Sequence, residues 1–481
     1  MTATTNTSIS GASGKQPGRL SQRATVRALL DDDFIWDAAE RLDALAADQL
    51  EGSHGGRPRA YPLVCGVIWD ALVSVFGSAR QVDVELSCVD SDWWDLIRRA
   101  AIKRAGILLP VEPMRRHHYR YLRDRYLTSN DTQLAVLTDT FTEHAARLAV
   151  EIGLCDPNGS GSLTHPSADR IVAGDGKVLT PRYKTSPNQR GTVDPATGEI
   201  RMRRADPDAG LHAVGGGDQA FGTKYVFLST RGDARNQRII LAVDHSPAKG
   251  PGGEAATALA AFDRVLPLLA GTQAVVYDGA FRGTHLHHLI TRHGIIPISR
   301  VHTAKGGTHR DRYLGEVSVN RAGGPASVQI HLRHGAPCVR QIAVDGTITL
   351  HPLERSKILR RQDRDSWRFY AEYRVPTTLG AGTIRLRLDR TTDDEDTGFN
   401  REEHLRAIPP ADPDHDRLYG RRNDTESGNR LLDDSMLRER AHTVGRRRQL
   451  LNLTTWAALR NATAATQHTR HHTNDPPSLA A

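Results

Sequence analysis

The chain has 481 residues, too many for one ordinary compact unit, so two or three domains sharing a well-buried core are expected. Its net charge of +8 and isoelectric point of about 9.4, supplied mostly by arginine, favour a phosphate-bearing partner, although some basic proteins never touch nucleic acid. The cysteines form no CxxC pair and have no histidine at zinc-ligand spacing, which argues against a zinc knuckle or a disulfide framework.

The amino-terminal residues 1–20 are polar and lack the hydrophobic core of a signal peptide, and no apolar run reaches transmembrane length. We therefore expect a soluble cytoplasmic protein with reduced cysteines and no membrane partner. Residues 1–20 are predicted to be a disordered tail.

Residues 21–150 are predicted to form a helical DNA-binding region, because apolar residues recur there at helical spacing. A loop containing Arg57 and Arg59 beside two glycines interrupts the pattern. Glycine allows close approach of a DNA backbone and arginine pairs with phosphate, but a solvated loop between helices explains the segment equally well. A second basic segment begins at Arg115 and Arg116 and interleaves arginine with tyrosine, which suits a nucleic-acid-binding face.

From residue 165 to residue 309 the pattern is that of a buried sheet, predicted to be the first part of a catalytic domain. Short apolar runs predict strands, and two longer periodic segments predict helices. In chain order these are Ile171–Leu179, Tyr225–Thr230, Ile239–Val243, the helix Glu254–Leu269, Ala274–Tyr277, the helix Thr284–His293 and Ile295–Ile298. Three strands followed by alternating helices and strands predict an α/β fold with a mixed sheet of the ribonuclease H-like type.

Residues 310–408 alternate apolar and polar side chains, as antiparallel strands do. The clearest runs are Val328–Leu332, Trp367–Val375 and Ile384–Leu388. They predict an inserted β-rich subdomain with a basic face, standing off the central sheet. Residues 181–219, rich in Pro, Gly, Asn and charge, are predicted to be a mobile loop.

Two aspartates emerge from the predicted sheet. Asp175 follows the apolar start of the first strand, and Asp278 ends a later strand and precedes a glycine. Singly, an Asp beside Gly after a strand is more often a turn residue than a metal ligand, but two in one sheet narrow that margin. Two Mg²⁺ ions, about 4 Å apart and bound by carboxylates, can activate the nucleophile and stabilise the leaving oxygen when a DNA phosphodiester is broken. Asp244 competes for this role, although its Ser-Pro sequel favours a turn.

A third acid lies on a predicted helix within residues 409–465, the second part of the catalytic domain. Tyr419, Arg422, Glu426 and Arg430 fall at i, i+3, i+7 and i+11, so they share one helix face. That face can grip a phosphate and offer one metal ligand, whereas a surface salt-bridge ladder is the plain alternative.

These residues resemble the insertion-sequence transposases with a DDE triad and a helix bearing Tyr, two residues, Arg, three residues, Glu, then six residues and Lys. Tyr419, Arg422 and Glu426 match that spacing. The resemblance extends to an acid in an Asp-Gly strand, a second in Tyr-Asp-Gly, a β insertion before the Glu helix and the amino-terminal Gly-Gly-Arg-Pro-Arg. Where the family has Lys, this chain has Asp433.

The resemblance implies that Asp175, Asp278 and Glu426 are catalytic residues and ligands of two Mg²⁺ ions, with Mn²⁺ as a substitute. It implies that Tyr419 and Arg422 contact DNA phosphates and that Arg430 substitutes for the missing Lys. Further implications are double-stranded DNA of transposon ends and target as substrate, a homodimer on DNA, and a bacterial cytoplasmic, nucleoid-associated location.

A carboxy-terminal helix with Arg446 and Arg447 is expected to help the catalytic domain hold DNA, followed by a disordered tail at 466–481. Two alternatives remain open. Asp433 motivates a domesticated, catalytically inactive DNA-binding protein, and a metal-dependent nuclease without strand transfer would use the same acids.

Overall fold

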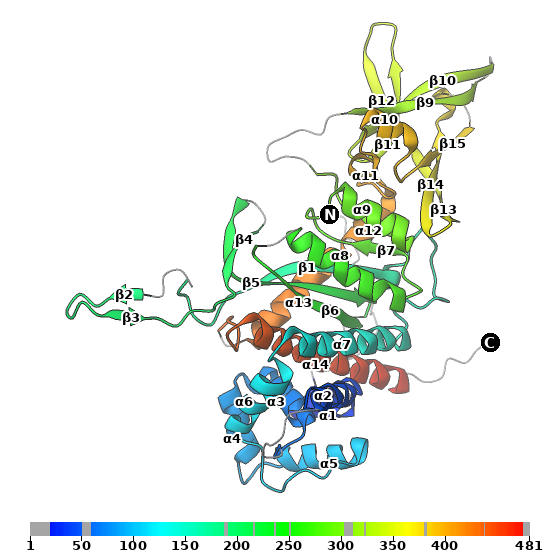
Figure 1. The fold of residues 1–481 in the computed structure, drawn as a ribbon. Coiled ribbons are helices and arrows are strands. Elements are labelled where there is room, and N and C mark those ends of the chain that lie inside the picture. The colour runs from blue at the N-terminus through cyan, green and yellow to red at the C-terminus, as the bar shows by residue number, and fades with distance from the viewer. Residues whose placement is uncertain are drawn as a thin grey trace, which may run out of the picture.

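The computed structural model describes residues 20–50, 59–186, 191–214, 217–234, 237–249, 252–302, 311–321, 324–379, 382–436 and 438–474. It is a mixed α/β structure in which helices cover a curled mixed sheet (Figure 1). A helical bundle lies at one end of the molecule and a β-rich part at the other, with the sheet between them.

The amino-terminal region is helical, as the periodicity predicts. Its helices are α1 Gln22–Asp31, α2 Phe34–Leu50, α3 Leu63–Phe76, α4 Ala79–Ser87, α5 Trp93–Ala105, α6 Arg116–Leu122 and α7 Asp131–Glu151, with a π-helical turn, η1, at Arg123–Leu127. Arg57 lies outside the described residues. No single described helix is long and apolar enough to cross a membrane; α3 and α4, bent by 103°, pass that test only as a pair.

The central sheet is built from β1 Ile171–Leu179, β4 Gly210–Ala213, β5 Gln219–Arg231, β6 Arg238–Ser246, β7 Ala274–Val276 and β8 Ile296–Ile298. Along the sheet, β6 pairs with β5, β5 with β1, β1 with β7 and β7 with β8, and β4 joins the other end of β5. The pairs β6–β5 and β5–β1 are antiparallel, whereas β1–β7 and β7–β8 are parallel. The predicted order of three strands, helix, strand, helix and strand is confirmed.

The next helices come from the middle and from the carboxy-terminal part of the chain. Helix α8, Gly253–Val265, packs against β5 and β6, and α9, Gly283–His288, runs into a π-helical turn, η6, at Leu289–His293. The last helix, α14, spans Arg446–Asn474 and packs on β6, α1, α3 and α7. Because α14 continues to Asn474, the tail predicted from residue 466 is helical over its first part.

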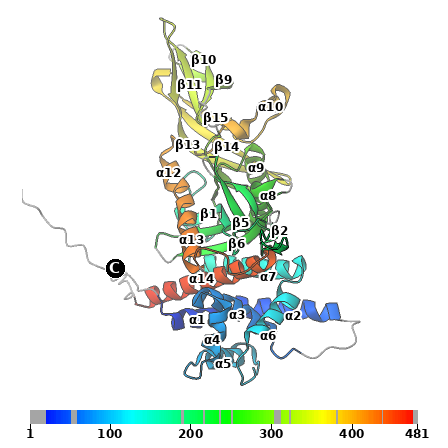
Figure 2. The same ribbon diagram turned by 90° about the vertical axis from the view of Figure 1, so that its left-hand side faces the viewer.

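One hydrophobic core joins the amino-terminal helices to the sheet. It runs from Val26 through the strands to Ala464, and α7 and α14 both pack on β6 (Figure 2). The helical region at 21–150 therefore shares its apolar interior with the central sheet. The sequence boundary marks a change of local structure within one packed unit.

The predicted insertion is antiparallel and separate from the central sheet in its hydrogen bonding. Strands β9 Arg312–Arg321, β10 Gly324–Arg333, β11 Ala336–Ile342 and β12 Ile348–Pro352 form one sheet, and β13 Glu354–Asp363, β14 Ser366–Val375 and β15 Gly382–Arg387 form another. Their core includes Ile171 and Ala173 of β1, so the insertion packs on one face of the central sheet. Two short helices, α10 Thr392–Thr397 and α11 Arg401–His404, follow β15 in the chain.

The segment expected as a mobile loop contains regular structure. Strands β2 Gly191–Val193 and β3 Ile200–Met202 pair as a hairpin, and β4 adds to β5. Gly198 has a positive φ of 69° in the turn between β2 and β3. The turn residues that indicate a loop in sequence therefore close a hairpin.

A buried carboxyl links the bundle to α14. Asp70 of α3 is 2 % exposed and accepts hydrogen bonds from Tyr119 of α6, from Asn452 at 3.2 Å and from Thr455 at 2.9 Å. Burial raises its pKa, and these hydrogen bonds oppose the increase. The carboxyl of α3 therefore satisfies polar groups from two other helices, α6 and α14, at once.

We predict that Asp70→Ala lowers the free energy of unfolding by about 3 kcal/mol, because it leaves three buried donors without their acceptor. Thermal unfolding of the full chain measures this as a lower melting temperature. Asp90→Ala, at an exposed turn, is the matched control and should change it little. Equal melting temperatures for the two variants would contradict this account of Asp70.

Candidate active site

Asp175 and Asp278 lie at matching positions on neighbouring parallel strands. In the pairing of β1 with β7, Ala173 is opposite Val276, and each aspartate comes two residues later in its own chain. Strands in a sheet are about 4.8 Å apart, so this register brings the two side chains to the same edge and face. Asp175 is 9 % exposed, which makes it a buried acid.

Burial raises the pKa of both carboxyls. The pKa of Asp175 is raised to about 6, chiefly because burial disfavours the charged form; Asp278 and Glu254 add to the increase, and Arg422 opposes it. Burial also raises the pKa of Asp278, with a further contribution from Glu254. The hydrogen bond from the Ala280 amide, at 2.9 Å, and the charge of Arg422 act in the opposite direction.

A third acid beside this pair, Glu254, was not predicted from the sequence. It stands at the start of α8, accepts a hydrogen bond from Tyr277 at 2.9 Å and pairs with Lys224. A Cβ at Gly176 would meet the Glu254 carboxylate at 2.2 Å, so the glycine after Asp175 makes room for it. The Asp-Gly pair was the only sequence signal for this contact.

The predicted Glu helix is divided into two. Helix α12 spans Pro413–Tyr419, and α13 spans Arg421–Ser435, with Gly420 between them. Helix α13 packs against β1, and Asn429 donates a hydrogen bond of 2.9 Å to Asp175. Because Arg422, Glu426 and Asn429 lie three or four residues apart, they share the face of α13 that meets β1.

The structure does not gather the three predicted carboxylates into one tight group. Within the described part of the chain, Asp175, Asp278 and Glu426 do not form a group whose ligand oxygens all lie within 4.8 Å of one another. Instead the Glu426 side chain is 56 % exposed and pairs with Arg422 at 3.5 Å. Like charges repel, so an arginine between the acids is the favourable arrangement for these side chains alone.

The position where the resembled family has Lys holds an ion pair. Asp433 accepts from the ammonium of Lys177 at 2.6 Å, and Lys177 lies two residues after Asp175 on β1. Arg430 is exposed, and the structure describes no contact between it and the acids. The expectation that Arg430 takes the place of the missing Lys is therefore not supported. The cation paired with Asp433 is Lys177 of β1.

Two further residues singled out in the sequence, Tyr419 and Asp244, make their described contacts elsewhere. Tyr419 stacks on His415 with ring centroids 5.2 Å apart, and the Arg300 guanidinium lies 5.0 Å from its ring. Asp244, the competing acid, is held by Arg264 at 2.8 Å and so serves an ion pair. Neither residue is placed among the acids by a described contact.

The predicted DNA-binding arginines of the two terminal regions mostly have acidic partners. Arg59 pairs with Asp43 at 2.5 Å, Arg115 with Asp83 at 3.1 Å, and Arg446 and Arg447 with Asp131 at 2.8 and 2.9 Å. Arg116 is exposed.

The basic segment around α6 is only partly a surface. Tyr119 is buried, stacks on Trp69 and bonds Asp70, so it serves the core. The exposed part lies around a hollow lined by His117, Arg120, Tyr121, Asp124 and Arg125. This surface keeps the predicted combination of arginine and an exposed tyrosine.

Comparison with known proteins identifies no relative: no family model matches the chain, and no curated protein matches it significantly.

We predict that Asp175→Asn stabilises the metal-free protein at pH 8 and has little effect near pH 4. A pKa raised from 3.8 to about 6 means that the folded state binds the proton more tightly than the unfolded state. The resulting stability is present below pH 4 and is lost as the pH rises through about 6, a difference of about 3 kcal/mol. Asparagine keeps the shape without the buried charge.

Melting temperatures in a chelator at both pH values test this. Asp90→Asn, an exposed substitution with the same change of charge, serves as the control. An equal effect of Asp175→Asn at both pH values would show that the charge of Asp175 is not the cause.

Proposed function

We propose that this protein is a DNA transposase whose ribonuclease H-like catalytic domain cleaves and joins DNA with Asp175, Asp278 and Glu426. The strand order β6–β5–β1–β7–β8, with the first three antiparallel and the last three parallel, supports the fold assignment. The single observation that carries the function is the pair formed by buried Asp175 on β1 and half-buried Asp278 just after the adjacent strand β7, with the helix bearing Glu426 packed on β1.

The donor set fits Mg²⁺, or Mn²⁺ in its place. Carboxylate oxygens are the ligands these cations prefer, and two neighbouring acids whose pKa values are raised by burial gain from a divalent cation. Bound there, two such ions would activate water or a 3′-hydroxyl and stabilise the leaving oxygen. Glu426 would have to leave Arg422 to join the aspartates.

The chain's own residues supply positioning for phosphate. Arg422 lies near both aspartates, and its buried Nε has no hydrogen-bond partner among the described residues. An unsatisfied buried guanidinium nitrogen is costly unless an anion accepts from it, and a DNA phosphate offers such oxygens. Asn429 holds Asp175 from the same helix face.

The proposal includes double-stranded transposon-end and target DNA as substrate and a homodimer as the active form. The exposed surface of Arg116, Arg120, Tyr121 and Arg125 offers cations for the DNA backbone, and Arg300 beside Tyr419 offers another. The rival readings differ in outcome: an inactive DNA-binding protein would bind without cutting, and a nuclease would cut without joining.

We predict that the purified chain, with Mg²⁺, cleaves DNA carrying the sequences that flank its own gene and joins the freed 3′ ends to a target plasmid. Asp278→Asn and Glu426→Gln should each slow cleavage at least about a hundredfold, equivalent to about 2.7 kcal/mol on the barrier. Both changes remove a ligand charge while keeping the size of the side chain. Strand cleavage and strand transfer are followed on gels.

Two further variants sharpen this test. Glu395→Gln, exposed on α10, is the control and should cleave normally. Glu254→Gln should retain more activity than Glu426→Gln, because Glu254 is already paired with Lys224 and Tyr277. The reverse order would identify Glu254 as the third catalytic acid, and binding without cleavage by the unmodified chain would favour the inactive rival.

A separate prediction concerns Asp433. Asp433→Asn should release Lys177 and tighten DNA binding, with the dependence of affinity on salt steepened by about one phosphate contact. Lys177→Gln should weaken binding. Asp434→Asn makes the same charge change at the adjacent, exposed position and provides the control. If Asp433→Asn and Asp434→Asn had equal effects in a salt titration, the Lys177 pair would not be responsible.

A further inference from the structure

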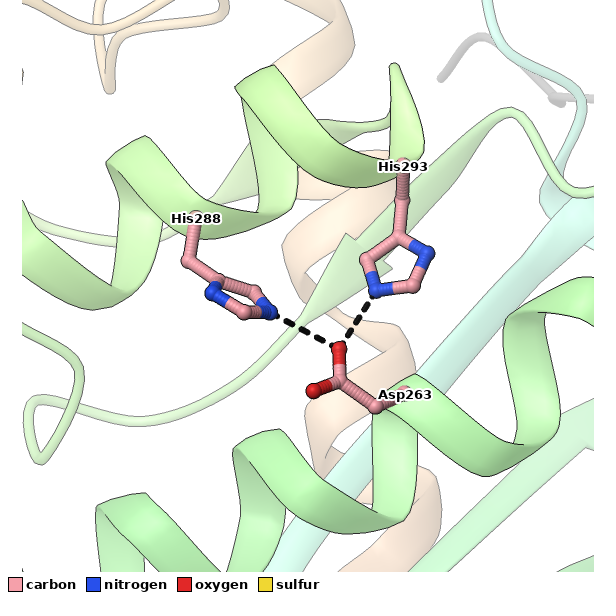
Figure 3. A group of neighbouring side chains, drawn as sticks. All are labelled: Asp263, His288 and His293. Atoms are coloured by element: carbon pink, nitrogen blue, oxygen red, sulfur yellow. Dashed lines mark hydrogen bonds and ion pairs between the residues drawn. The ribbon is translucent and has the colours of Figure 1, made fainter. Parts of the chain in front are cut away.

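A compact group of three potential metal ligands lies outside the acids described above. Asp263 comes from α8, His288 from the end of α9 and His293 from the end of the π-helical turn η6 (Figure 3). Both imidazoles point at one carboxylate oxygen: His288 Nε2 is 2.8 Å and His293 Nε2 is 2.6 Å from Asp263 Oδ1. Among the described residues, this is the group of three His, Cys, Asp or Glu whose ligand atoms all lie within 4.8 Å.

The π-helical turn is what brings the two histidines together. In an α-helix, residues five apart point about 140° away from each other, so His288 and His293 would diverge. A π-helix has hydrogen bonds from i to i+5 and more residues in each turn, which returns the fifth residue to the same side. The helix is irregular at the one place where regular geometry would separate the pair.

The carboxy-terminal end of the turn that bears the histidines is held by contacts with the β insertion. Gly294 follows His293 with a positive φ of 61°, and its carbonyl accepts a 2.7 Å hydrogen bond from Arg360 of β13. The Arg360 guanidinium lies 4.4 Å from the ring of Trp367, and a Cβ at Gly294 would meet that ring at 2.8 Å. The histidine-bearing turn is therefore locked between α8 and the inserted β sheet.

The chemistry of the group suits a transition metal. Two imidazole nitrogens and one carboxylate oxygen form a set that Zn²⁺ binds with a fourth position left to water, whereas Mg²⁺ prefers oxygen ligands throughout. The side chains of Asp263, His288 and His293 are 24 %, 28 % and 9 % exposed, so the group is sheltered yet reachable. Arg292, 3.9 Å from Asp263, carries a positive charge that opposes the binding of a cation.

We propose that Asp263, His288 and His293 bind one Zn²⁺ ion that ties α8 to the turn beneath the β insertion. The ion takes the place of the protons now shared between the imidazole Nε2 atoms and Asp263, so each histidine binds as a neutral ligand. Tetrahedral ligands sit about 3.3 Å apart, so each Nε2 would move away from Asp263 Oδ1 by about half an ångström or slightly more from the present 2.8 and 2.6 Å. This site shares no residue with the proposed DNA chemistry.

The experiment uses the full chain, freed of metal, titrated with Zn²⁺ against a coloured chelator and with Co²⁺ by visible absorption. We expect one Zn²⁺ per chain, a cobalt spectrum of low coordination number, and a higher melting temperature with Zn²⁺. His288→Gln and Asp263→Asn should each weaken binding at least tenfold and abolish the thermal shift. Asp90→Asn, at an exposed turn outside both sites, should leave all three measurements unchanged.

The matched control replaces another close histidine pair. His117 and His118 have Nε2 atoms 3.0 Å apart on exposed α6, and their double change to Gln should keep Zn²⁺ affinity. Loss of binding in that control, or equal Zn²⁺ affinity in His288→Gln and in the unmodified chain, would overturn the proposal. Should His288→Gln fail to fold, the near-isosteric Asp263→Asn decides between the same outcomes.

Discussion

The central electrostatic constraint is that Asp175 is buried in the sheet and Asp278 is half-buried beside it. A carboxylate taken from water is expensive, which is why both pKa values are raised; Asp278 and Glu254 add to the increase at Asp175, and Glu254 adds to it at Asp278. The surrounding groups act as partial compensation: Asn429 donates to Asp175, and Arg422 lowers the pKa of both acids. Such an arrangement is unfavourable for folding alone and favourable for a cation, and this is the reason to place function here.

Helix α13 carries that compensation on one face. Arg422 lowers the pKa of Asp175, Asn429 donates a hydrogen bond to Asp175, and Asp433 pairs with Lys177. Glu426 lies on the same side of the helix, between Arg422 and Asn429 in the chain. The Lys177–Asp433 pair places the cation on the strand and the acid on the helix. A positive charge therefore lies two residues after Asp175 on β1.

Local pattern was sufficient for much of the fold. The apolar run at Ile171–Leu179 matches β1 in both bounds, since a strand buried among others needs little beyond local hydrophobicity. The shared core between the amino-terminal helices and α14 could not be predicted, because it depends on contacts between residues hundreds of positions apart. For the same reason the sequence indicated Asp175 and Asp278 and missed Glu254, whose place beside them is set by the packing of α8.

The histidines show a different limit, because their spacing is misleading when regular helix geometry is assumed. His288 and His293 converge only through a π-helical turn, which no periodicity in the sequence announces. Helix α8 then connects the two chemical centres: Glu254 in its first turn faces the paired aspartates, and Asp263 near its end faces the histidines. Nine residues of helix separate them by about 13 Å, close enough for a rigid element to transmit a shift from one centre to the other. An ion that fixed the far end of α8 would thereby limit the freedom of Glu254, and through it the charge balance of the buried acids.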